Sequence, residues 1–105
     1  MNDVQLNGIQ YFVLIADQKK KSKFLALLGE HGARSIDTVY AHGSMSPSAI
    51  ADAFGFEAEP NKVMISCLLK TENAKRLMEI LYTDYKFNKP NTGIAFSIAV
   101  EGLAF

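Results

Sequence analysis

Two residues of this 105-residue chain have types and settings that could serve ligand binding. His42 ends an alternating segment just before Gly43, and an imidazole there could stack on a base, ligate a metal or make a structural hydrogen bond. Gly93 precedes a long uncharged segment. It could let a ligand approach the backbone, or it could simply set the turn into a strand. Both residues therefore carry a functional and a structural interpretation.

The other reactive side chains do not form a catalytic pattern. The sequence has no Ser/His/Asp, Cys/His, paired-carboxylate or phosphate-loop arrangement, so we do not expect an enzyme. Cys67 is the only cysteine and is interpreted as a packed small hydrophobe. His31 is interpreted as a helix C-terminal residue favoured by the helix dipole. Its separation from His42 gives no metal-binding spacing, so no metal ligands are assigned.

Composition narrows the class of protein. Eleven basic and eleven acidic side chains cancel, which argues against a nucleic-acid partner or an anionic membrane bound by bulk charge. One cysteine excludes an internal disulfide, and no apolar run approaches a membrane span. The N-terminus shows no signal-peptide pattern, so we expect a cytoplasmic protein.

Periodicity predicts a single domain over residues 1–105 with two similar halves. Strands are expected at 9–16, 35–42, 62–69 and 94–100, and helices at 18–31 and from Thr71 to about residue 85. Asp17 and Thr71 are the expected N-caps, and Gly32 the expected end of the first helix. Residues 43–61 form a long excursion with a short helix expected at 47–54. This order predicts an α+β, ferredoxin-like βαββαβ fold, with a four-stranded antiparallel sheet and two helices on one face.

The last strand suggests an oligomer because neither of its rows carries a charge. We expect the bulky row to face the helices and the small row to face neighbouring subunits. The bulky row is Ile94, Phe96, Ile98 and Val100; the small row is Ala95, Ser97 and Ala99. Two helices can cover only one face of the sheet, so a sheet that is apolar on both faces predicts a homo-oligomer.

Two stretches then resemble the nitrogen regulatory protein P-II superfamily, in its P-II-like branch. Residues 39–43 (VYAHG) resemble the strand that enters the P-II T-loop, and residues 89–98 (KPNTGIAFSI) resemble the B-loop and the strand after it. The resemblance implies a homotrimer with effector clefts between subunits, a T-loop over residues 44–61, and signal transduction through a partner such as a transporter or metabolic enzyme. It also implies these ligand-binding residues: Ala41, His42, Gly43, Ser44, Asn91, Thr92 and Gly93.

The ligand expected from the resemblance is a small effector, with an adenine nucleotide as a candidate. This chain has Ile94 where P-II proteins carry a lysine after the B-loop glycine, and it has no basic residue after Lys89. A triphosphate needs cations or several backbone donors, so we expect a less charged ligand than ATP bound in the P-II manner. Two alternatives stay open. One is a trimeric metal-binding or metal-tolerance protein using His42 with Asp52, Glu57 or Glu59; the other is a structural assembly module.

Overall fold

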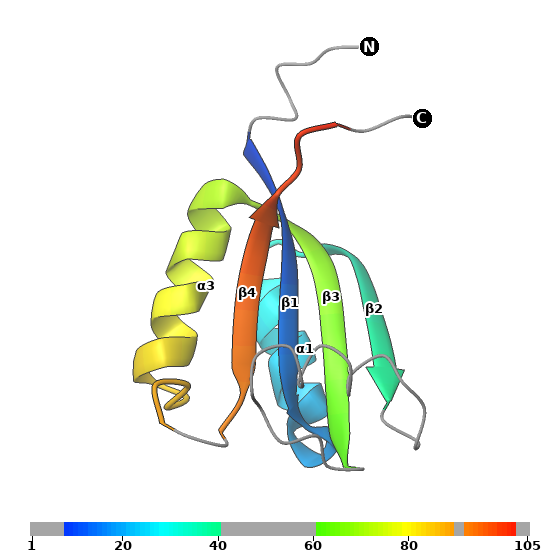
Figure 1. The fold of residues 1–105 in the computed structure, drawn as a ribbon, viewed down its shortest axis with the longest axis vertical. Coiled ribbons are helices and arrows are strands. Elements are labelled where there is room, and N and C mark those ends of the chain that lie inside the picture. Colours follow the sequence, from blue (N-terminus) through cyan, green and yellow to red (C-terminus); the bar gives the residue numbers. More distant parts are fainter. Residues whose placement is uncertain (1–7, 41–60, 90–91, 103–105) are drawn as a thin grey trace.

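Four strands form one antiparallel sheet in the computed structural model of the chain, which describes residues 8–40, 61–89 and 92–102 (Figure 1). The strands are β1 (Ile9–Asp17), β2 (Arg34–Tyr40), β3 (Lys62–Lys70) and β4 (Ile94–Ala99). Their order across the sheet is β2-β3-β1-β4, and every neighbouring pair is antiparallel. This order confirms the predicted ferredoxin-like fold class. The short helix expected at 47–54 lies outside the described residues.

The first helix begins more tightly than the sequence predicts. A 3₁₀ turn, η2 (Gln18–Lys20), precedes α1 (Lys21–Glu30). Asp17 is the N-cap of that turn, as expected, because its Oδ1 accepts a hydrogen bond of 2.9 Å from the Lys19 N–H. At the other end Gly32 has φ +78, and the N–H groups of Gly32 and Ala33 donate back to carbonyls of the last turn. This Schellman ending confirms the role predicted for Gly32.

The second helix, α3 (Thr71–Thr83), lies along the β4 edge, while α1 lies behind the sheet in the view of Figure 1. Thr71 was expected as its cap, and this expectation is wrong. Lys70 occupies the N-cap position without a side-chain cap bond, and the Thr71 hydroxyl accepts from Gln10 Nε2 at 3.3 Å. The threonine therefore links the start of α3 to β1.

One core lies between the sheet and the two helices. Alternate residues of β1 and β3 point into it, together with one stripe of each helix. The strand members are Phe12, Leu14, Ala16, Val63, Ile65, Cys67 and Leu69, and the helix members are Phe24, Leu27, Leu28, Ala74, Leu77 and Leu81. Burial raises the pKa of the Cys67 thiol to about 11, so this cysteine stays protonated and packs as a small apolar residue, as predicted.

The side chains of β4 point in the opposite directions from those the sequence predicted. Ala95 pairs with Leu14 and packs against the helix-side core, whereas Phe96 pairs with Val13, which alternates away from that core. The expectation that Ile94, Phe96 and Ile98 face the helices is therefore wrong. Of the small row, Ala95 packs against the same core as Tyr85 and Phe87, just after α3, whereas Ser97 and Ala99 are exposed.

The sheet face opposite the helices, here called the far face, is largely apolar. Cross-strand register places its side chains in rows. These rows are Arg34–Leu68–Tyr11–Ile98, then Asp37–Ser66–Val13–Phe96, then Val39–Met64–Ile15–Ile94, so the charged members come from β2. Tyr11 and Ile98 are 39% and 54% exposed. The far face thus keeps the apolar character that the sequence predicted, but β4 supplies it with large side chains in place of small ones.

Candidate functional site

The described candidate residues Thr92 and Gly93 belong to one end of the sheet. β2 stops there at Tyr40, and β3 and β4 begin there at Lys62 and Ile94; we call it the loop end. It is the lower end in Figure 1. Tyr40 pairs with Val63, and Ile15 pairs with both Met64 and Ile94, so the strands are in register at this end.

Two of the seven predicted residues can be described in atomic terms. Thr92 and Gly93 lie at the loop end, directly before β4, and both are half-buried. The other five, Ala41, His42, Gly43, Ser44 and Asn91, lie outside the described residues, as do the metal candidates Asp52, Glu57 and Glu59. The strand that would deliver residues 41–44, β2, ends at the loop end.

Gly93 is required by packing. A β-carbon at this position would stand 2.4 Å from Cζ, 2.7 Å from Cε2 and 2.9 Å from Cε1 of Phe87. Gly32 is the only described glycine with positive φ, so the need for glycine at position 93 comes from the aromatic ring and not from its own backbone conformation. The structural interpretation of Gly93 therefore has a definite cause, which is the ring of Phe87.

Phe87 is itself held in place by contacts with core residues. Its ring packs edge-on against Phe24 of α1, with centroids 5.8 Å apart and planes at 74°. Its N–H donates to the carbonyl of Leu81 at 3.0 Å. Phe24 also meets Tyr85 at 5.3 Å between centroids. The start of β4 is thus fixed to the helix layer through one chain of aromatic contacts.

Lys62 is a buried cation at the loop end, and the sequence prediction treated it only as the start of a strand. It is 8% exposed, and a lysine is almost never buried unless it is paired. Its neighbour Val63 points into the helix-side core, so Lys62 belongs to the far face. A lysine opening an apolar strand directly after a long excursion was the signal that could have found it.

Lys62 has an acidic neighbour across the sheet. It pairs with Asp17 in the β1–β3 register. The two residues therefore stand in register at the loop end, where β1 ends and β3 begins. A lysine ammonium can bind phosphate oxygens, and the Asp17 carboxylate already accepts hydrogen bonds from Lys19 and Asn61.

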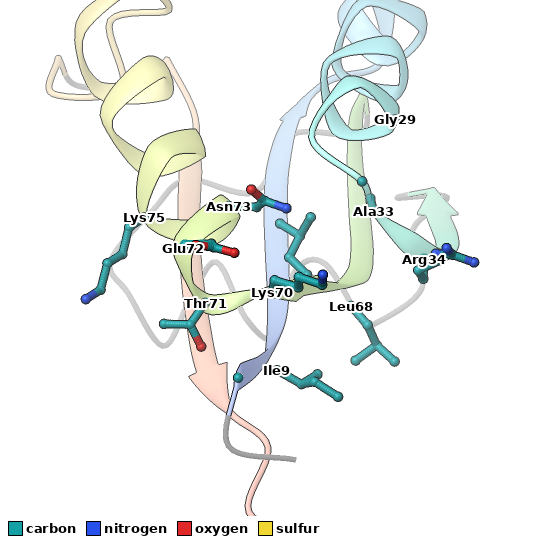
Figure 2. A pocket seen from close by; sticks show the side chains of 13 residues that line it. Ile9, Gly29, Ala33, Arg34, Leu68, Lys70, Thr71, Glu72, Asn73 and Lys75 are labelled. Carbon is teal, nitrogen blue, oxygen red and sulfur yellow. The ribbon is translucent and has the colours of Figure 1, made fainter. Parts of the chain in front are cut away.

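A second concave surface lies at the opposite end of the sheet. It is an open cavity of about 1220 Å³ between the end of α1 and the start of α3, lined in part by Arg34, Lys70 and Lys75. Figure 2 shows the Arg34 and Lys75 side chains pointing to opposite sides of the cavity. The cationic groups do not converge, so this cavity does not form an anion cradle.

Other candidate chemistries find little support in the described part of the chain. His31 Nδ1 lies 2.8 Å from the carbonyl oxygen of Leu27, which can only accept, so the imidazole donates to its own helix as a structural residue. Among the described residues no three His, Cys, Asp or Glu side chains cluster closely enough to hold a metal ion. None of the described helices combines the length and the apolar character that crossing a membrane requires.

Comparison with known proteins finds the fold but no sequence relative. No family model matches the sequence, and no curated protein matches it. Among solved structures, a PII-like signalling protein of Thermus thermophilus superposes with a TM-score of 0.61, at 14% identity, over 86% of this chain and 83% of that one. This chain has the fold of the P-II-like signalling proteins.

Two further P-II structures carry nucleotides. CPII of Thiomonas intermedia K12, a nitrogen regulatory PII-like protein bound to ADP, AMP and bicarbonate, matches with a TM-score of 0.60 and 18% identity, over 85% of this chain and 88% of CPII. GlnK of B. subtilis in complex with ATP matches with a TM-score of 0.60 and 16% identity, over 90% of this chain and 84% of GlnK. The resemblance seen in the sequence is thus confirmed at the level of the P-II-like fold.

Proposed function

We propose that this protein is a P-II-like signalling protein that binds a small effector, an adenine nucleotide, in clefts between the subunits of a homotrimer. The effector would control a partner protein, a transporter or metabolic enzyme, through residues 44–61. The observation that carries the proposal is the P-II-like fold over most of the chain, shared with a protein bound to ADP and AMP. Ala41, His42, Gly43, Ser44, Asn91, Thr92 and Gly93 remain the proposed contact residues.

The far face supports self-association. Its row of Leu68, Tyr11 and Ile98 presents large apolar side chains. The chain has no net charge, so copies of it do not repel one another strongly. Tyr11 and Ile98 are 39% and 54% exposed, so covering them contributes part of the roughly 1.5–3 kcal/mol that a fully exposed side chain would give. This gain favours covering the row with further copies of the chain.

Lys62 supports the choice of a phosphorylated effector. Ile94 stands where P-II proteins carry a lysine, so the chain needs another cation for a diphosphate or monophosphate. Lys62 lies on the same end of the sheet and faces away from the core. We therefore add Lys62 to the proposed contact residues, with the role of binding phosphate oxygens.

The test is titration calorimetry on a preparation whose mass has been measured by light scattering. We expect a trimer that binds ADP or AMP with one site per subunit. A stable monomer would contradict the assembly, and a verified trimer that binds none of ATP, ADP and AMP would contradict the effector.

A charge-removing variant tests the role of Lys62. Lys62→Met keeps the apolar stem and removes the ammonium, which costs a charge-assisted hydrogen bond of about 1.5–3 kcal/mol, or about 10- to 100-fold in ADP affinity. Adenosine, which has no phosphate, should bind the variant and the wild type equally. Lys70→Met is the matched control, because Lys70 is exposed at the other end of β3. Equal loss for ADP and adenosine would show that Lys62 does not bind phosphate.

A further inference from the structure

Both ends of the excursion between β2 and β3 are held by one short segment, Asp17–Lys21, here called the β1–α1 junction. Tyr40 is the last described residue before the excursion and Asn61 the first after it. β2 and β1 are not neighbours in the sheet, because β3 lies between them. The junction therefore reaches Tyr40 from the helix layer, and it meets Asn61 at the end of β1.

The first contact fastens the β2 side. Lys21 Nζ donates to the hydroxyl of Tyr40 and also lies 5.0 Å from the centroid of the same ring. The tyrosine is half-buried and packs against the core on the helix side. The hydrogen bond from the ammonium therefore fixes the hydroxyl end of the ring.

The second set of contacts fastens the β3 side. The Gln18 N–H donates to the Asn61 carbonyl at 2.7 Å, and Gln18 Nε2 donates to the carbonyl of Lys62 at 3.2 Å. Asn61 Nδ2 donates to Asp17 Oδ2 at 3.3 Å. The other oxygen of Asp17 accepts from Lys19 in the η2 cap, so the carboxylate is already oriented by its own turn.

These contacts add little to the hydrophobic core. None of the residues of η2 is buried, and Asp17 and Lys21 are half-buried. Removing a partly exposed polar contact of this kind costs little folding free energy, but it releases the chain that it holds. The same junction holds the backbone of Lys62, the cation proposed to bind phosphate.

We propose that the β1–α1 junction is the positioning element of the effector site: through Lys21–Tyr40 and Asp17/Gln18–Asn61 it sets where both ends of the excursion stand, and so sets effector affinity. Lys21 and Asp17 are positioning residues and do not touch the ligand. The inference rests on the proposed function for its statement about affinity.

Paired variants test the inference. Lys21→Met removes the ammonium, and Lys21→Arg restores a cationic donor. Asp17→Ser keeps an N-cap hydroxyl but is too short to reach Asn61. Lys20→Met is the control, since Lys20 is an exposed lysine of the same segment. The readouts are the calorimetric affinity for ADP, the urea midpoint, and NMR hydrogen exchange of the amides of residues 39–40 and 61–62.

We expect Lys21→Met and Asp17→Ser to bind ADP at least fivefold more weakly and to exchange faster at the amide flank each releases, with urea midpoints close to wild type. Lys21→Arg should recover affinity to within twofold, and Lys20→Met should match wild type. Faster exchange with unchanged affinity, or unchanged exchange, overturns the inference and leaves the proposed function standing. A wild-type trimer that binds no nucleotide overturns the proposed function, and the affinity claim made here falls with it.

Discussion

Gly93→Ala should destabilise the fold, although alanine is usually the better residue for stability. The new methyl group would meet three ring atoms of Phe87 at 2.4, 2.7 and 2.9 Å, separations that real β-carbons essentially never show. The ring cannot move away freely, because it packs edge-on against Phe24 at 5.8 Å. Overpacking of this kind costs about 1–3 kcal/mol. With urea m-values of about 1–3 kcal/mol/M, that loss lowers the unfolding midpoint by about 1 M.

Two companion variants make the result decisive. Gly29→Ala is the matched control: its β-carbon would meet nothing within 4 Å, and it lies within α1, so the same substitution should gain about 0.5–1 kcal/mol. Phe87→Leu removes most of the ring, and in a Gly93→Ala background it should recover part of the loss as a coupling free energy. All unfolding curves need one fixed protomer concentration, because association shifts apparent stability. If Gly93→Ala is as stable as wild type, or if Phe87→Leu gives no coupling, the packing explanation of Gly93 is refuted.

Two shorter predictions concern the far face and the core. Ile98→Asp should dissociate the oligomer in light scattering, because it places a charge on an exposed apolar row, whereas Ser97→Asp next to it points to the opposite face and should leave the mass unchanged; an Ile98→Asp protein of wild-type mass would exclude this row from the interface. The pKa of Cys67, raised to about 11, means that the folded state disfavours the thiolate that the unfolded chain forms above the ordinary value of 9.0. The stability linked to this thiol is therefore fully present below pH 9 and is lost as pH rises to 11, by up to about 1.4 kcal/mol per pH unit. Urea unfolding of wild type and Cys67→Ala across this range should show the extra slope only in wild type, and equal slopes would contradict it.

Periodicity was enough to predict the elements and their order. The stripe of Ala74, Leu77 and Leu81 has helical spacing, and all three are buried. The apolar runs of β1 and β3 matched strands to within one residue at the described ends. Asp17 and Gly32 worked as the expected start and stop signals because capping depends on local backbone geometry, which the sequence encodes directly.

The same reasoning could not predict which row of β4 side chains faces the helices. A strand repeats every two residues, so its pattern fixes two rows, but it does not say which row faces the helices when neither row is charged. Tertiary packing settles the direction: Ala95 packs against the helix-side core, and so do Tyr85 and Phe87, which follow α3. Thr71 failed as a cap for a similar reason, since its hydroxyl accepts from Gln10, a partner 61 residues away.

The absence of a lysine at position 94 does not leave the loop end without a cation. Ile94 lies on the far face in the row of Ile15 and Met64, and Lys62 lies on the same face one row nearer the loop end, about 7 Å along the strand. A cation can therefore serve the loop end without occupying position 94. Burying a lysine is costly unless its charge is compensated, and Lys62, which is 8% exposed, has an interaction partner within the protein. If Lys62→Met raises the free energy of unfolding while weakening ADP binding, the lysine is kept for the ligand at the expense of stability, as functional sites often require.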